Sequence, residues 1–83
     1  MEQLTKQQIL SEALIARDQE LLGYQINIDN YTLAIEKITN EYPNNEDLQV
    51  FKNELQMRLE EELRQQLRCK IIRDIIALQV ESK

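Results

Sequence analysis

Few side chains in this sequence could carry out covalent or metal chemistry. Histidine is absent, which removes the usual general base and the commonest metal ligand. The single cysteine, Cys69, therefore has no histidine with which to form a zinc site or a Cys–His nucleophile. Gly23 is the only glycine, so a glycine-rich phosphate loop is ruled out. We expect no catalytic residue, no metal site and no cofactor, and predict that the protein is not an enzyme.

The acidic and cysteine residues that could bind a metal or act as a nucleophile are better explained as structural or surface residues. Glu60, Glu61 and Glu62 form an acidic run, but consecutive helical residues point in different directions, which favours a solvated surface. A carboxylate metal site in a helical bundle normally adds a Glu-x-x-His pair, which this chain cannot supply. Cys69 is predicted to be a small buried apolar residue, with a disulfide between two chains or a redox role as the alternative.

A locally basic segment lies between residues 58 and 73. Its cations are Arg58, Arg64, Arg68, Lys70 and Arg73. They could contact the phosphates of a nucleic acid, or they could pair with carboxylates of this chain. The formal net charge of -5 opposes long-range attraction of nucleic acid, so we prefer the second interpretation and keep the first as the alternative.

The composition is typical of long helices in one small domain, residues 1–83. One Gly and one Pro argue against a loop-rich or β-sandwich fold. No segment approaches the roughly 20 apolar residues that span a bilayer. The polar segment from Met1 to Gln8 does not resemble a signal peptide. We therefore expect an acidic, cytoplasmic protein that does not enter a membrane.

A first helix is predicted over residues 5–41. Thr5 can act as its N-cap, and Gln8, three residues later, can complete a capping box. Gly23 and several weak helix formers up to Asn30 lie inside this range, so a kink or break there is the alternative.

A second helix is predicted over residues 46–80. Pro43 disfavours helical geometry for the residue before it and so ends the first helix. Asn45 is a suitable N-cap. Glu46 and Asp47 then complement the dipole of the first turn. Two helices of similar length with a short connection predict an antiparallel hairpin and an all-α fold.

The apolar residues indicate which helix faces meet. On the first helix they recur every three or four residues, the heptad spacing of a coiled coil: Leu10, Leu14, Arg17, Leu21, Tyr24, Ile28, Tyr31, Ile35, Ile38 and Tyr42. We call these residues the first seam, in which Arg17 is the one charged member. On the second helix the apolar stripe is Leu48, Phe51, Leu55, Leu59, Leu63, Leu67, Ile71, Ile75 and Leu78.

We predict that the first seam packs on this apolar stripe, with Arg17 paired to Asp74. The stripe averages about 3.75 residues per turn, whereas the first seam keeps 3.5. The two helices are therefore expected to splay, or to change their contact face, toward the termini.

Large apolar residues remain outside the predicted hairpin contact. On the first helix they are Ile15, Leu22, Ile26 and Leu33, which we call the rear stripe. On the second helix they are Cys69, Ile72, Ile76 and Val80. We expect both sets to lie at the end that carries the termini and to pack against a second copy, giving a homodimeric four-helix bundle. The alternative is a break at Gly23 that folds part of the rear stripe into a local three-helix core.

These patterns predict a non-enzymatic protein–protein interaction module. It would act as an adaptor, an assembly factor or a small acidic inhibitor through helix packing, with another protein or a second copy as partner. The alternative function is a helical dimer that binds nucleic acid through the Arg-rich face of the second helix.

Overall fold

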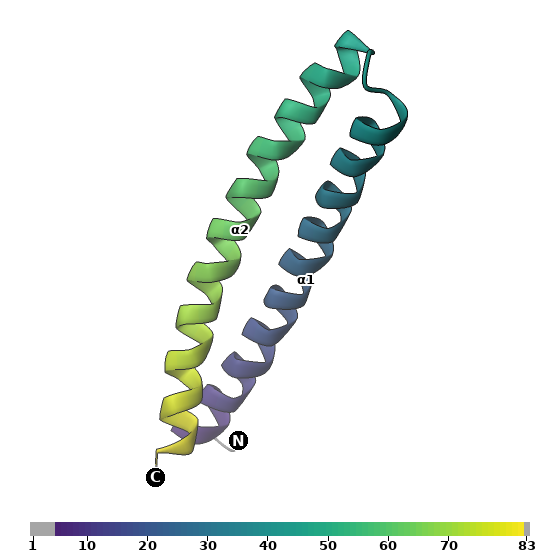
Figure 1. Ribbon diagram of the computed structural model, residues 1–83. Coiled ribbons are helices and arrows are strands. Elements are labelled where there is room, and N and C mark those ends of the chain that lie inside the picture. The colour runs from purple at the N-terminus through teal and green to yellow at the C-terminus, as the bar shows by residue number, and fades with distance from the viewer. Residues whose placement is uncertain (1–4, 83) are drawn as a thin grey trace.

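The computed structural model describes residues 5–82, and it consists of two helices in an antiparallel hairpin (Figure 1). Helix α1 spans Lys6–Glu41 and helix α2 spans Glu46–Glu81. Each has 36 residues, so the two pack along their full length in a rod of 62 × 24 × 15 Å. The predicted all-α hairpin is confirmed, with helix ends within one residue of those expected.

Local hydrogen bonds explain where the helices begin and end. The Thr5 hydroxyl accepts from the Gln8 backbone N–H at 3.1 Å, and the Gln8 side chain accepts from the Thr5 N–H at 2.8 Å. This is the predicted capping box. Asn45 caps α2 in the same way by accepting from the Leu48 N–H at 3.0 Å. The sequence signals at both helix starts are therefore confirmed.

Helix α1 runs without a break through the segment where a kink was the alternative. Two polar side chains in or next to this segment form hydrogen bonds to groups four residues away in the same helix, so they do not interrupt it. Gln25 donates to Asp29 at 2.9 Å, and the Thr32 hydroxyl donates to the Ile28 carbonyl at 2.8 Å. The Cβ that an alanine would add at Gly23 meets nothing within 4 Å. The local three-helix core is therefore wrong, and α1 is one continuous element.

The first seam faces α2 as predicted. Ile28 and Ile38 are buried, and the other members of the first seam are half-buried except Tyr42, which lies exposed beside the turn. Heptad spacing keeps a side chain directed at the neighbouring helix in every turn of α1. This spacing is what holds the hairpin together from the turn to the termini.

The predicted contact face of α2 is wrong beyond Leu59. Leu63, Leu67, Ile71, Ile75 and Leu78 are all exposed, and Phe51 is exposed as well. The buried or half-buried residues of α2 instead include a second heptad series, which we call the second seam: Leu48, Lys52, Leu55, Leu59, Glu62, Gln66, Cys69, Arg73, Ile76 and Val80. Four members of this series are charged or amide side chains between Lys52 and Arg73, which is why hydrophobicity alone did not identify it.

Helix geometry explains the difference between the apolar stripe and the second seam. Two helices that pack along their length touch at residues that recur about every 3.5 positions. Residues four apart advance by slightly more than one turn, so the apolar stripe rotates out of the contact as it passes Leu63. The helices do not separate as a result, since Gln7 still donates to the carbonyls of Gln79 and Ser82 at the terminal end. Of the two expected outcomes, splaying is not observed, whereas the face of α2 in contact with α1 does change from the apolar stripe to the second seam.

The second seam predicts unequal effects for two leucines of the apolar stripe. Leu55 is 4% exposed and Leu78 is 63% exposed. Leu55→Ala should lower the free energy of unfolding by about 2–5 kcal/mol, because it removes buried methyl groups and leaves a cavity. Leu78→Ala should change it by less than about 0.5 kcal/mol. Urea titration followed by circular dichroism measures both, and equal losses would contradict the second seam.

Gly23 offers a test of the continuous helix. Gly23→Ala should raise the free energy of unfolding by roughly 0.5–1 kcal/mol, because alanine restricts the unfolded chain and its Cβ enters open space. Thermal unfolding measures the change. A lower melting temperature in the alanine variant would mean that Gly23 adopts a conformation other than the helical one.

Candidate protein-interaction surface

The rear stripe of α1 is solvent-exposed along its length. Ile15, Leu22, Ile26 and Leu33 expose between 53% and 62% of their surface. Spacings of seven, four and seven residues place the four side chains in one row on the side of α1 away from the first seam. The prediction that these residues lie outside the hairpin contact is confirmed. The row occupies the middle of α1, however, and not the end that carries the termini.

A groove of about 530 Å³ lies beside the rear stripe, where α1 and α2 meet. We call it the central groove, and its lining residues are Leu21, Leu22, Gln25, Leu63, Gln66, Leu67 and Lys70. Leu22 belongs to both the rear stripe and the central groove. Leu63 and Leu67 reach the groove because the apolar stripe of α2 has rotated out of the helix contact at this level. The two features together form one apolar surface that crosses both helices.

Two side-chain hydrogen bonds join α1 to α2 near mid-length. Gln66 donates to Gln25 at 2.9 Å, and both residues line the central groove. Asn27 donates to Glu62 at 3.4 Å, and neither of these two residues lines the groove. The bonds give polar members of the second seam partners on α1 while Leu63 and Leu67 stay exposed.

The second predicted set of interface residues is only partly available to a partner. Cys69 is buried against α1, and Ile76 and Val80 are half-buried as members of the second seam. Their placement on an outer face of α2 was wrong, because they continue the heptad contact toward the termini. Ile72 differs from them, since it is exposed and lies beside the seam. A role of this set at an interface stays a prediction, and Ile72 is the member most accessible to a partner.

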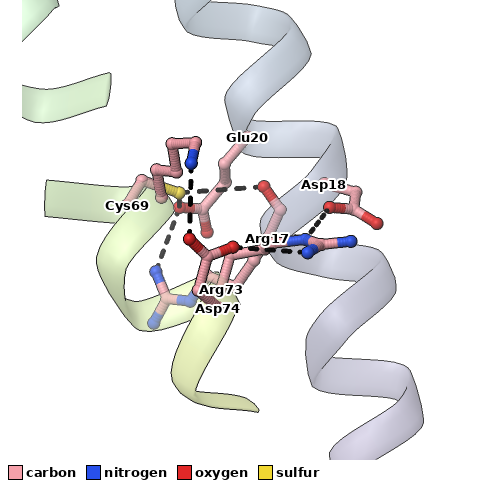
Figure 2. Close-up of polar contacts among 7 residues, drawn as sticks. Arg17, Asp18, Glu20, Cys69, Arg73 and Asp74 are labelled. Carbon is pink, nitrogen blue, oxygen red and sulfur yellow. Dashed lines mark hydrogen bonds and ion pairs between the residues drawn. The ribbon is translucent and has the colours of Figure 1, made fainter. Parts of the chain in front are cut away.

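A cluster of polar contacts surrounds Cys69 and fixes the two helices relative to each other (Figure 2). Arg73 donates through Nε to Asp18 at 2.8 Å and through Nη1 to Asp74 at 3.3 Å. Lys70 lies 3.4 Å from the second oxygen of Asp74. Within residues 5–82, the Arg73–Asp18 bridge is the one ion pair that joins α1 to α2. Partly exposed pairs of this kind contribute on the order of 0–1 kcal/mol, so the cluster sets register more than stability.

The expected pairing of Arg17 with Asp74 is wrong. Arg17 instead forms an ion pair with Glu20 at 3.1 Å, one turn along its own helix. Asp74 is already engaged by two cations of α2. The arginine side chain is long enough to pair with a carboxylate one turn away on its own helix. Alignment of the two helices therefore does not predict which carboxylate Arg17 contacts.

The environment of Cys69 disfavours reaction of its thiol. Its Sγ lies 3.7 Å from the Arg17 carbonyl oxygen and 3.6 Å from the Glu20 carboxylate. Burial, followed by the contact with Glu20, raises the pKa of the Cys69 thiol above its ordinary value. Since the thiolate is the nucleophile, this position disfavours redox or nucleophilic chemistry. The prediction that Cys69 is a buried core residue is confirmed.

Thiol titration tests this environment. In the folded protein, Cys69 should react with a disulfide reagent such as 5,5′-dithiobis(2-nitrobenzoate) at neutral pH at least roughly tenfold more slowly than in urea, because burial and the raised pKa both lower the concentration of accessible thiolate. The colour change at 412 nm, a property of the reagent, gives the rate. Equal rates with and without urea would place the thiol on the surface.

The five cations of the basic segment from residue 58 to residue 73 do not converge on one face. Arg58, Arg64, Arg68, Lys70 and Arg73 occupy five different positions of the seven-residue repeat. Three of the five are paired: Arg64 with Glu61 at 2.9 Å, and Lys70 and Arg73 with the carboxylates of the polar cluster. Pairing with carboxylates of this chain, the preferred interpretation, accounts for these three. The arrangement gives nucleic-acid binding less support than the apolar surface gives protein binding.

Sequence reasoning did not identify the central groove. Leu63 and Leu67 continue the apolar stripe of α2, and this pattern predicts that they lie in the hairpin contact. A signal was present in their spacing, because four consecutive steps of four residues from Leu55 to Ile71 must rotate around the helix. The rotation alone, without the partner helix, could not show that these leucines would meet Leu22.

Comparison of the chain with protein-family models, with curated proteins and with solved structures finds no match. Within residues 5–82, neither helix contains a segment that is both long and apolar enough to cross a membrane. The same residues contain no group of three or more cysteine and carboxylate side chains arranged to hold a metal ion.

Proposed function

We propose that this protein is a non-enzymatic protein–protein interaction module that binds a helical partner through the rear stripe and the central groove. The observation that supports this most directly is the continuous apolar surface made by Leu22, Leu63 and Leu67 with the other rear-stripe residues. Contiguous apolar surface on a small protein is a frequent mark of a binding site, whereas isolated exposed apolar residues are not.

The shape of this surface suits a helix. A partner helix presents apolar side chains at positions i, i+4 and i+7, and the members of the rear stripe are likewise separated by four or seven residues. The central groove between α1 and α2 is a concave apolar site at mid-length into which such side chains can pack. The net charge of -5 would then influence partner choice and the rate of association more than the affinity. An adaptor, an assembly factor and a small acidic inhibitor all fit this mode of action.

Site-specific photocrosslinking in the native cells tests the proposal. A benzoylphenylalanine in place of Leu22 should form covalent adducts with protein, because this side chain lies in the rear stripe and the central groove. The control carries the same group in place of Glu54, an exposed residue of α2 outside both features. Circular dichroism should show equal helix content in the two variants.

The expected result is a discrete adduct for the Leu22 position, larger than for the control by at least roughly tenfold. Equal adduct yields at the two positions would contradict a defined binding surface. Adducts at the Glu54 position alone would place the surface on the opposite side of the hairpin.

A further inference from the structure

The rear stripe has the same pattern when it is read in either direction. Ile15 and Leu33 each lie nine residues from Tyr24, and Leu22 and Ile26 each lie two residues from it. An antiparallel copy of α1 centred on Tyr24 would therefore place Leu22 opposite Ile26 and Ile15 opposite Leu33. In a two-fold symmetric interface, if residue i of one copy contacts residue j of the other, then residue j of the first copy contacts residue i of the second. The spacing of the rear stripe satisfies this rule.

The hairpin exposes more surface than a compact chain of its size. A monomer of 9.9 kDa is expected to expose about 5,200 Å², whereas this chain exposes 6605 Å². The excess of about 1,400 Å² is larger than the roughly 800 Å² that each partner contributes to a standard interface. The large apolar residues buried in the described hairpin are only Ile28, Ile38 and Leu55. A second copy could therefore bury about 800 Å² of this chain, and the chain would still expose more surface than a compact monomer of its mass.

The central groove lies at the level where the symmetry axis would pass. Its lining residues Leu22 and Gln25 lie within two residues of Tyr24, and both helices reach their midpoints at this level (Figure 1). Two hairpins related by an axis at mid-length overlap along their whole length of about 54 Å. Ile26 of the partner would then lie against Leu22, at the edge of the groove of the first copy, and the reverse.

We propose that the occupant of the rear stripe and the adjoining edge of the central groove is a second copy of this chain, with the two α1 helices antiparallel around a two-fold axis that crosses the rear stripe at the level of Tyr24. The product is a four-helix bundle with both α1 helices at its centre. This inference rests on the proposed function, because it names the partner of the same surface.

Acidic residues on the face of α1 that carries the rear stripe make the salt dependence of binding different for self-association and for binding to a basic partner. The positions that extend the rear stripe at its two ends are Glu12 and Glu36, and Asp29 lies between Ile26 and Leu33. In the proposed dimer, Glu12 of one copy lies opposite Glu36 of the other. Added salt screens this repulsion, so dimerisation should be unchanged or stronger at higher salt. Binding to a basic partner would instead weaken as salt is added.

Sedimentation equilibrium of the full chain tests the dimer, with matched substitutions to locate the interface. Ile26→Glu changes a rear-stripe residue that is 53% exposed in the hairpin, and Ile75→Glu changes an α2 residue that is 52% exposed and outside the proposed contact. The unsubstituted chain should sediment at twice its mass at micromolar concentration. Ile26→Glu should weaken dimerisation by roughly tenfold or more, because two carboxylates enter an apolar contact. Ile75→Glu should have no effect on it.

Spin-label distances between copies test the antiparallel arrangement. In a Cys69→Ser chain, labels at Asn30 or at Asn40 should be separated along the helix axis by about 18 Å and about 48 Å respectively, from the rise of about 1.5 Å per residue. A parallel dimer would give similar short distances at both positions.

Three results would overturn the inference. They are equal weakening by the two glutamate substitutions, equal spin-label distances, and a mass of one chain at micromolar concentration. A single-chain mass together with Leu22 adducts to other proteins would overturn self-association and leave the proposed function standing. A single-chain mass without such adducts would overturn both.

Discussion

The structure depends on one geometric constraint, which is that two long helices remain in contact only through residues that recur about every 3.5 positions. The first seam meets this constraint from Leu10 to Ile38 with side chains that are all apolar or aromatic except Arg17. The second seam meets it with a mixture, in which Leu55 and Leu59 near the turn give way to Glu62, Gln66 and Arg73 toward the termini. The position of a residue in the repeat, and not its hydrophobicity, decides which side chains of α2 face α1.

That constraint also produces the candidate binding surface. Once polar residues of α2 occupy the second seam, the leucines beside them have to lie outside the contact, and Leu63 and Leu67 become exposed next to Leu22. The polar residues are accommodated because α1 offers partners at the same level, namely Gln25 for Gln66 and Asp18 for Arg73. The exposure of Leu63 and Leu67 therefore follows from their positions in the seven-residue repeat, beside a contact that Gln66 and Arg73 help to hold.

Local signals in the sequence were sufficient to predict the helices. Thr5, Pro43 and Asn45 mark their limits through capping and through loss of helical geometry, which depend only on neighbouring residues. The first seam and the rear stripe were also predictable, because apolar residues occupy both. The second seam was not, since the partners of Arg73 and Gln66 lie on α1, some 40 to 55 residues away in sequence. The central groove depends on the same long-range contacts and was missed for the same reason.

The most direct test of the second seam is a set of methyl–methyl nuclear Overhauser effects within one chain, recorded on a mixture of isotopically labelled and unlabelled protein to exclude contacts between copies. Leu10 and Leu14 of α1 lie at the level of the last turns of α2. The second seam predicts strong effects from these leucines to Ile76 and Val80, which are half-buried. Strong effects to Ile75 and Leu78 in their place would contradict it.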